Sequence, residues 1–365
     1  MVSHVSVFRD PGRYAGWPAN YGIWSWDDEI AVGFAVGYPN LLGGFHTCDH
    51  DRPFVTMQAR SLDGGLTWQV QPIPCRTPGN RALSADEHVR PELGMARALE
   101  AEASALEDCP GNTDLAHPDL ALLCARSGLR EGACSWFYLS EDRCQTWQGP
   151  FRLPMFGQAG IAARTDYVIS GSKECTLFLT AAKADGEEGR VFCARTLDRG
   201  RSFRFRSWVG AEPAGYAIMP ASVHLGASRA LVAVRCQESM PGTGDKANWI
   251  DVYASDDDAV TWRYVSRPVP NTGPGGNPPA MIRLRDGRLC LTYGYRAAPY
   301  GIRARLSADE GETWGTEIVL RGDGGNHDLG YPRTTQRADG QAVTVYYWND
   351  RPDGERYIVA TIWSP

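Results

Sequence analysis

The sequence predicts an all-β fold, a six-bladed β-propeller of four-stranded antiparallel blades in one domain, residues 1–365. Three observations predict it: an eight-residue turn motif that recurs five times, short strand-like runs that end in Asp-Gly or Gly-rich turns, and little helix-forming sequence between them. The motif recurs at intervals of 52 to 79 residues, and six blades in 365 residues give about 61 residues each.

The repeated motif reads S-x-D-x-G-x-T-W and has the composition of a tight turn between two strands. The Asp carboxylate can accept hydrogen bonds from amides of its own turn, and Gly permits a positive φ. Thr and Trp are favoured at the start of the next strand. We therefore expect every copy to be structural. The copies are Ser61–Trp68, Ser140–Trp147, Thr196–Phe203, Ser255–Trp262 and Ser307–Trp314.

This pattern resembles the Asp-box of the sialidase superfamily, and the resemblance extends from about Trp17 to about Tyr347. It implies a propeller whose boxes lie away from the active site, with loops from several blades converging on one mouth of a central channel. Closing the ring requires both termini in one blade, and the run Tyr357–Ile362 with an N-terminal strand is the candidate pair.

Residues 84–118 are the exception to the all-β pattern. Pro91 stands where a helix could begin, and Leu93, Ala96 and Leu99 start an apolar face at helical spacing. We expect a helical insertion in a loop on one propeller face. It could be a lid, a partner contact or simple packing.

Composition narrows the partners. The formal net charge is −6 and the chain has no basic run, which argues against nucleic acid as a partner. The sequence has no run of 18 apolar residues, so we expect no membrane-spanning helix. Ten cysteines without CxxC pairs favour free thiols in a reducing compartment. With no signal-peptide pattern at the N-terminus, we expect a cytoplasmic location, secretion of a trimmed precursor being the alternative. No cofactor and no metal are predicted.

The loop at residues 44–53 contains two His and two Asp within six residues, in a chain with seven His. In the sialidases that the chain resembles, the catalytic acid lies at this offset before the first box. A carboxylate beside an imidazole also suits proton transfer, because it fixes the tautomer and raises the basicity. The alternative is a polar loop whose Asp side chains cap turns. The candidates are His46, Asp49, His50, Asp51 and Arg52.

Tyr331 precedes the Asp339-Gly340 turn by eight residues. This spacing is similar to that of the late sialidase segment with the nucleophilic Tyr, so the resemblance implies that role for Tyr331. A neutral phenol suits an anionic sugar, because a carboxylate nucleophile would be repelled. The alternative is a packed Tyr at a strand end.

The stretch 275–296 resembles the sialidase pattern N-E-[PST], D-G-R-L, N-x-R, which puts Arg296 at the second Arg of the carboxylate-binding triad. A guanidinium binds a carboxylate bidentately, whereas a solvated strand-end Arg is the alternative. Pro278 replaces the Glu that activates the Tyr, and Trp17 replaces the first triad Arg. Candidates for the third Arg are Arg303 and Arg333.

Two Arg–carboxylate units complete the candidate set. Arg164 and Asp166 are expected on one side of a strand, where they could hold substrate or form a structural salt bridge. Arg235 and Glu238 form a similar unit one blade later, and Glu238 could replace the missing Glu.

Three functions remain open, all with a glycan as partner. The first is a sialidase-like exo-glycoside hydrolase for a terminal acidic sugar, with Tyr331 as nucleophile, a carboxylate of the 44–53 loop as acid/base and Arg296 holding the sugar. The second is a polysaccharide lyase that eliminates at a uronic acid with His46 or His50, Tyr331 and Arg296. The third is a non-catalytic glycan-binding propeller.

Overall fold

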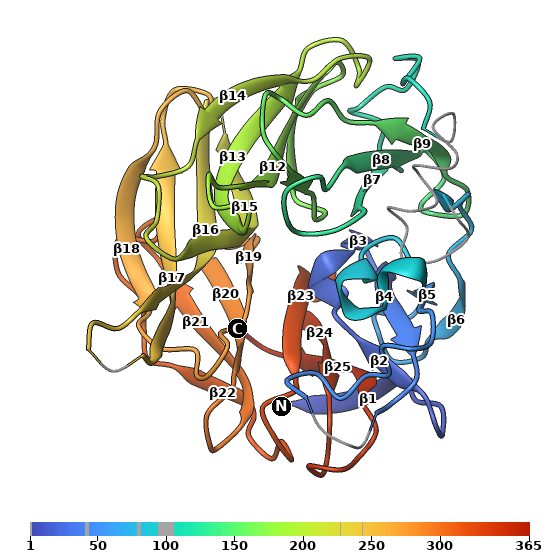
Figure 1. Cartoon of the computed structure of the whole chain (residues 1–365), viewed down its shortest axis with the longest axis vertical. Coiled ribbons are helices and arrows are strands. Elements are labelled where there is room, and N and C mark those ends of the chain that lie inside the picture. Colours follow the sequence, from blue (N-terminus) through green and yellow to red (C-terminus); the bar gives the residue numbers. More distant parts are fainter. Residues whose placement is uncertain (1, 41–43, 79–81, 94–105, 227, 243) are drawn as a thin grey trace.

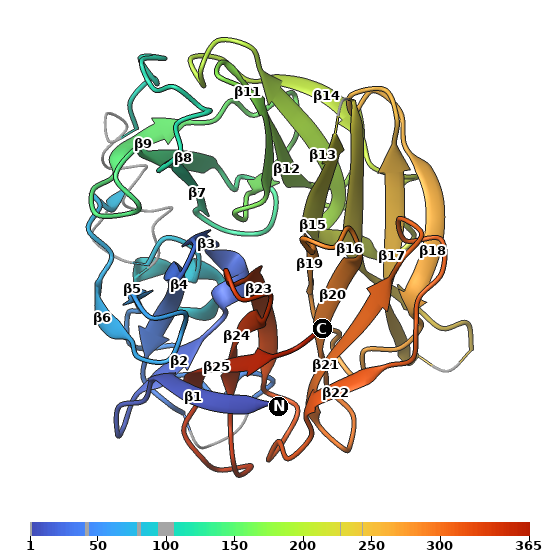
Figure 2. The same ribbon diagram turned by 180° about the vertical axis from the view of Figure 1, so that it is seen from behind.

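The computed structural model describes residues 2–40, 44–78, 82–93, 106–226, 228–242 and 244–365. Six antiparallel sheets stand around a central axis as blades, and views from both sides show the same ring (Figure 1, Figure 2). The sequence-based prediction of a six-bladed all-β propeller is confirmed.

The blades differ in strand number. Blade 1 contains β2 (Tyr14–Gly16), β3 (Ile23–Trp26), β4 (Glu29–Gly37), β5 (Val55–Ser61) and β6 (Gln69–Pro72). Blade 2 contains β7 (Ala121–Arg126), β8 (Ser135–Ser140) and β9 (Gln148–Arg152). Blade 3 contains β10 (Ile161–Ala162), β11 (Tyr167–Gly171), β12 (Glu174–Ala182), β13 (Glu188–Thr196) and β14 (Arg204–Trp208).

The remaining blades have the predicted four strands. Blade 4 contains β15 (Tyr216–Gly226), β16 (Arg229–Ser239), β17 (Lys246–Ser255) and β18 (Arg263–Val269). Blade 5 contains β19 (Pro279–Arg283), β20 (Leu289–Tyr295), β21 (Gly301–Ser307) and β22 (Ile318–Arg321). Blade 6 contains β23 (Gly330–Gln336), β24 (Ala342–Trp348), β25 (Tyr357–Trp363) and the N-terminal β1 (Ser3–Phe8).

Both termini belong to blade 6, as predicted. β1 pairs antiparallel with β25, with Val5 opposite Ala360, so the first strand of the chain is the outer strand of the last blade. This pairing ties the N-terminal strand into the last blade by backbone hydrogen bonds, and the chain continues from β1 into blade 1, so the ring is closed.

The five motif copies are the turns that lead into the outermost strand of blades 1 to 5, which are the turns β5–β6, β8–β9, β13–β14, β17–β18 and β21–β22. In the first copy Asp63 Oδ1 accepts hydrogen bonds from the amides of Leu66 (3.1 Å) and Thr67 (2.9 Å). Hydrogen bonds from Thr67 lower the pKa of Asp63 to about 2. At the glycine position φ is 89° for Gly65 and 60° for Ala259, so even the degenerate copies adopt the left-handed conformation.

The two breaks in the strand pattern lie next to the axis. In blades 1 and 3 the innermost strand is split in two, β2/β3 and β10/β11, around residues 17–22 and 163–166. The expectation of a strand through Arg164 and Asp166 is therefore wrong, because both residues lie in the second break. In each break a backbone carbonyl is free of strand pairing: the carbonyls of Ala19 and Thr165 both accept hydrogen bonds from Arg333.

The expected helix at residues 84–118 is not found in its described part. Short 3-10 turns occupy Asp86–His88 and Pro91–Leu93, so the helix predicted from Pro91 is wrong there, while residues 94–105 lie outside the described residues. The amide of Arg126 in β7 donates to the carbonyl of Leu83 at 3.0 Å, which puts Leu83 at the free edge of β7, where an innermost strand of blade 2 would be. Within the described chain, no helix is long and apolar enough to cross a membrane.

Candidate functional site

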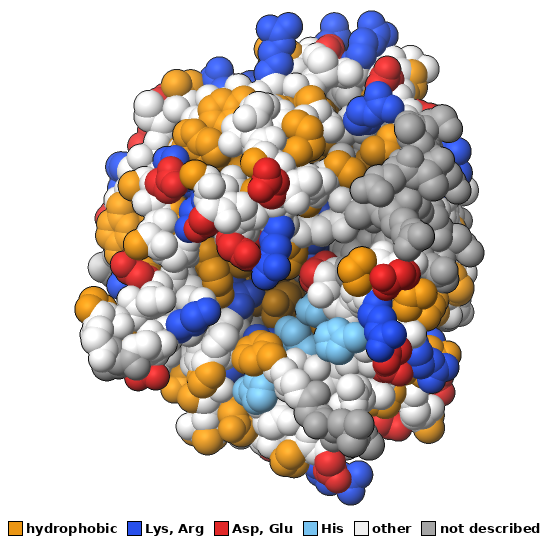
Figure 3. All heavy atoms as spheres, viewed as in Figure 1, with side chains coloured by type: hydrophobic (Ala, Val, Ile, Leu, Met, Phe, Trp, Pro, Cys, Tyr) orange, Lys and Arg blue, Asp and Glu red, His pale blue; other side chains and the backbone are white. Residues whose placement is uncertain are grey.

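The candidate site lies at one mouth of the central channel. In blades 1, 3, 4 and 5 the Asp-box turn is on the same side as the turn that follows the innermost strand, so the opposite face carries the loops between the next two strands and the connections between blades. Figure 3 shows a central hollow on one face, where Lys or Arg and His side chains gather among hydrophobic ones. The loop of His46 joins β4 to β5 and therefore belongs to this face.

Tyr331 stands at the start of β23, in a left-handed conformation with φ of 50°. Such a φ is unfavourable for a bulky residue and persists only where neighbours hold it. The buried Asn277 does so, because its Oδ1 accepts the Tyr331 amide at 2.9 Å and its Nδ2 donates to the Leu329 carbonyl at 3.0 Å. In this conformation the Tyr331 ring lies near the rings of His46 and Tyr347.

Two guanidinium groups face the Tyr331 side chain. Arg235 Nη1 donates to the Tyr331 hydroxyl at 3.2 Å, and the Arg296 guanidinium carbon lies 5.4 Å from the centroid of the Tyr331 ring. Burial alone would raise the pKa of Tyr331, but the positive charges of Arg235, Arg296 and Arg164 outweigh burial and lower that pKa. The phenol is consequently a stronger acid than an ordinary tyrosine.

Arg296 is fixed by the protein itself. It is 1% exposed and donates to the carbonyls of Leu329 (3.2 Å) and Gly276 (3.0 Å) and to the Tyr347 hydroxyl (2.7 Å). The predicted substrate Arg thus lies beside Tyr331, with its N–H groups engaged within the fold. The positive charge of Arg296 still contributes to lowering the pKa of Tyr331.

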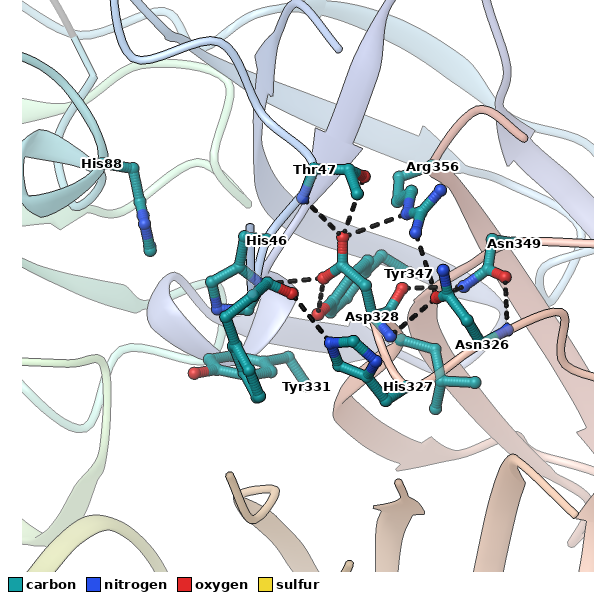
Figure 4. A network of polar contacts seen from close by, with 12 residues as sticks. His46, Thr47, His88, Asn326, His327, Asp328, Tyr331, Tyr347, Asn349 and Arg356 are labelled. Carbon is teal, nitrogen blue, oxygen red and sulfur yellow. Dashed lines mark hydrogen bonds and ion pairs between the residues drawn. The ribbon is translucent and has the colours of Figure 1, made fainter. Parts of the chain in front are cut away.

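Asp328 is the centre of a buried network that reaches the 44–53 loop (Figure 4). Its Oδ1 contacts His46 Nδ1 at 2.7 Å and accepts the Tyr347 hydroxyl at 2.9 Å. Its Oδ2 accepts the Thr47 amide and Arg356 Nε, each at 3.0 Å. Burial raises the pKa of Asp328, but His46, Arg356 and the other donors hold it far below the usual range, so the group is a carboxylate.

This carboxylate determines the tautomer of His46. An ionised carboxylate only accepts hydrogen bonds, so Nδ1 of His46 carries the proton and Nε2 keeps its lone pair. Burial lowers the pKa of His46, and nearby Arg296 and Arg235 add to that effect against the attraction of Asp328. The imidazole is therefore a neutral base, and its ring centroid lies 6.4 Å from that of Tyr331.

A second histidine, His88, was missed in the sequence. Its ring stacks on Trp17 at 4.0 Å with an interplanar angle of 12°, and lies 5.1 Å from the ring of His46. Burial lowers the pKa of His88 to about 3. The adjacent Glu87 forms an ion pair with the buried Arg126. The adjacent Glu87 and His88 could have indicated a functional site in the sequence, but they lie in the segment that was predicted to be helical.

Glu188 was also missed, and it pairs with a predicted site residue. Arg164 donates from Nη2 to Glu188 Oε2 at 3.2 Å, and both side chains are less than a tenth exposed. Arg164 Nε also reaches Asn20 Oδ1 at 3.4 Å. The salt-bridge alternative for Arg164 is therefore observed, with Glu188 and not Asp166 as the partner.

The remaining predicted residues lie apart from Tyr331. Asp49 Oδ1 accepts the Asp51 amide at 2.8 Å, and exposed Asp51 pairs with Arg90, so both carboxylates serve their own loop. His50, Arg52 and Glu238 are exposed. The Arg52 guanidinium stacks on Tyr38, and Arg303 pairs with Glu317 at 2.6 Å on blade 5. Asp166 and Arg333 line a deeper cavity of the channel.

The site brings together a phenol, a neutral imidazole and uncompensated positive charge. Among the described residues, neither Arg235 nor Arg296 forms an ion pair with a carboxylate, and no carboxylate is hydrogen-bonded to the Tyr331 hydroxyl. No cluster of three or more His, Cys, Asp or Glu in the described ranges has the arrangement of a metal site. The arrangement can hold an anion, accept a proton at His46 and donate one from Tyr331.

Known structures share this fold over the whole chain, although no protein-family profile matches the sequence and no curated protein does. A protein of unknown function from Dyadobacter fermentans is 20% identical, with a TM-score of 0.70 over 100% of this chain and 99% of that one. A Penicillium chrysogenum α-L-arabinanase complexed with arabinobiose is 12% identical, with a TM-score of 0.60 over 99% and 97%.

The sialidases form another group of neighbours. A mutant of the NanB sialidase from Streptococcus pneumoniae is 11% identical, with a TM-score of 0.61 over 98% of this chain and 70% of that one. The chain is therefore similar in structure to sialidases and arabinanases, which are propeller glycosidases. At these identities the similarity describes the fold.

Proposed function

We propose that this protein is a carbohydrate-active enzyme that cleaves a glycan next to a carboxylated sugar, by β-elimination at a uronic acid. The observation that carries the proposal is the Tyr331 phenol, held by Arg235 and Arg296 beside the neutral His46. Two positive charges without carboxylate partners favour an anionic ligand, because an anion offsets charge that the fold leaves unbalanced.

Each group has a role in that reaction. His46 Nε2 takes the proton from the sugar carbon next to the carboxylate, and the positive charges of Arg235 and Arg296 stabilise the negative charge that develops there. The bond from the neighbouring carbon to the glycosidic oxygen then breaks as a carbon–carbon double bond forms. Tyr331 donates its proton to the leaving oxygen, and solvent exchange returns the proton from His46 to the phenol.

The lowered pKa values suit these roles. A neutral His46 is ready to accept a proton, since Asp328 holds its other nitrogen in the donor form. Tyr331 is acidified by Arg235, which makes it a better proton donor to an alkoxide. A hydrolase with a tyrosine nucleophile would instead need a proton donor to the leaving group and a partner base for the phenol.

Hydrolysis at an acidic sugar is the second candidate, favoured by one observation. Tyr331 lies at the channel mouth among arginines, in a fold shared with sialidases. In this reaction the Tyr331 oxygen would attack the anomeric carbon and His46 would have to be protonated first. The lowered pKa of His46 counts against that step.

The experiment incubates the protein separately with uronate-containing polysaccharides and sialylated oligosaccharides. Absorbance of the unsaturated uronate and release of reducing sugar are followed together. Elimination produces both signals in equal amounts, whereas hydrolysis produces reducing sugar alone. Sugar release without a double bond would refute elimination, and the absence of both signals would refute cleavage of these substrates.

Matched variants separate the roles. We expect Tyr331→Phe and His46→Gln each to lower turnover at least 100-fold, the low end of typical general acid–base contributions. Tyr264→Phe and His224→Gln are the controls, because Tyr264 is exposed on β18 and His224 lies towards the far end of β15. Retained activity in Tyr331→Phe would remove Tyr331 from both reactions.

A further inference from the structure

A second cavity lies in the central channel, beyond the candidate site. Its volume is about 300 Å³, and the innermost strands β3, β11, β15, β19 and β23 line it. In blades 3, 4 and 6 the cavity residue follows, in sequence, a residue near the mouth: Asp166 follows Arg164, Ser222 follows Met219, whose sulfur lies 3.4 Å from Arg235 Nη1, and Thr334 follows Tyr331. The cavity is therefore on the Asp-box side of the mouth.

Arg333 lies across the channel between the mouth and this cavity. Its Nη2 donates to the Ala19 carbonyl of blade 1 at 2.7 Å and to the Thr165 carbonyl of blade 3 at 2.6 Å. One side chain from blade 6 thus bridges two other blades. Among the described residues, the lining of this cavity includes none of the side chains that contact the Tyr331 side chain.

The polar lining of the cavity has unused hydrogen-bonding capacity. Asp166 is 7% exposed, and its Oδ1 accepts both the Ser222 amide (3.0 Å) and the Ser222 hydroxyl (2.8 Å). Its buried Oδ2 has no partner among the described residues, and neither has Nε of Arg333. A buried acceptor without a partner is costly, so a ligand hydroxyl that donates to it gains affinity.

The charges and the walls indicate the kind of ligand. Asp166 and Arg333 carry opposite formal charges, so an ion of either sign would be repelled by one of them. Hydroxyl groups can donate to a carboxylate and accept from a guanidinium, which suits a polyol. Trp24, Met281 and Ile282 supply apolar wall for the carbon-bound faces of such a molecule. The volume is at the low end of small-molecule pockets.

We propose that this channel cavity is a second ligand site, separate from the mouth, that binds a small neutral polyhydroxylated molecule the size of a monosaccharide. Hydroxyl groups of the ligand hydrogen-bond to the polar side chains of the lining, Asp166 and Ser222 among them. The proposal does not depend on the reaction at Tyr331, since binding here would occur in a protein without any catalytic activity.

The test is saturation-transfer NMR on the whole protein. The probe is a mixture of D-glucose, D-galactose, D-mannose, L-arabinose and L-rhamnose at millimolar concentration. At least one sugar receives saturation from the wild type. Binding weakens at least tenfold in Asp166→Asn and in Ile282→Trp, which fills the cavity, and is unchanged in Tyr331→Phe at the mouth.

Other results overturn the proposal. If no sugar receives saturation, the cavity does not take this class of ligand. If Tyr331→Phe abolishes binding while Ile282→Trp preserves it, the sugar occupies the mouth. Thermal unfolding of each variant shows whether it is folded, and Ser222→Ala gives a milder second change, since it removes one hydrogen bond to Asp166. Unchanged binding in a folded Asp166→Asn protein would also refute the proposal.

Discussion

Arg235 Nη1 and the Tyr331 hydroxyl are 3.2 Å apart, although the two residues belong to blades 4 and 6. Arg235 is 7% exposed and lies in β16, the second strand of its blade. Tyr331 begins the innermost strand of its own blade. Charge from one blade therefore sets the acidity of a phenol on another, with Arg296 of blade 5 adding to the effect.

Replacing Arg235 by Met should raise the pKa of Tyr331. The variant loses a positive charge and a hydrogen bond that favour the phenolate, while burial continues to oppose it. The measurement is the tyrosinate absorbance during a pH titration, with the Tyr331→Phe titration subtracted. Arg263→Met on the outer strand is the control. An unchanged Tyr331 titration in Arg235→Met would contradict this account.

Asp328→Asn should reduce both stability and turnover. The substitution leaves the buried Arg356 without its carboxylate, which typically costs about 3–5 kcal/mol. It also replaces a group that only accepts hydrogen bonds by an amide that can donate or accept, so the tautomer of His46 is no longer fixed and activity should fall even where the protein remains folded. Chemical denaturation and turnover are compared with exposed Asp323→Asn. Equal stability in the two variants would argue against the buried network.

Acid should destabilise the protein through His88. Burial lowers its folded pKa to about 3 from an unfolded 6.5, so the unfolded state binds more protons between these values. As far as His88 is concerned, the free energy of unfolding has its full value above pH 6.5 and falls on acidification. The slope for this group is up to about 1.4 kcal/mol per pH unit. Urea unfolding between pH 6.5 and 5 should show a smaller slope in His88→Gln, and equal slopes would contradict the assignment.

Gly330→Ala should disturb Tyr331 more than a comparable change elsewhere. A Cβ at Gly330 would lie 2.4 Å from Asn277 Nδ2, at a φ of 105°. Gly340 has a φ of 87° with nothing within 4 Å, so Gly340→Ala isolates the conformational cost. The difference in unfolding free energy should be about 1–3 kcal/mol. Turnover should fall in Gly330→Ala alone, and similar values for both variants would oppose this role of Asn277.

The Asp-box should affect stability without affecting the site. Asp63→Ala removes acceptors for the amides of Leu66 and Thr67 and for the Thr67 hydroxyl, at a cost of about 1–2 kcal/mol. Exposed Asp353→Ala is the control. Because the boxes and the mouth lie on opposite faces, turnover of the folded Asp63→Ala protein should equal that of the wild type. A loss of turnover would show that the box contributes to the site.

Local patterns in the sequence determined the blades and their closure. Each Asp-box turn is held by hydrogen bonds among eight consecutive residues, so its signal is complete in the sequence. The resemblance to sialidase motifs pointed to Tyr331, Arg296 and the loop of His46, and these side chains lie near one another in the structure. Reasoning from local patterns failed at residues 84–93, where a helical pattern concealed the segment that carries Glu87 and His88.

Only the tertiary structure decided which side chains meet. Asp328 is distant from His46 in sequence and Arg235 from Tyr331, and their contacts exist because successive blades direct their inner ends towards one axis. The roles of Asp49, Asp51 and Glu238 were uncertain for the same reason, since composition does not show that these side chains face their own loops or solvent. Local hydrogen bonds thus determined the turns and blades, while packing around the axis determined the site.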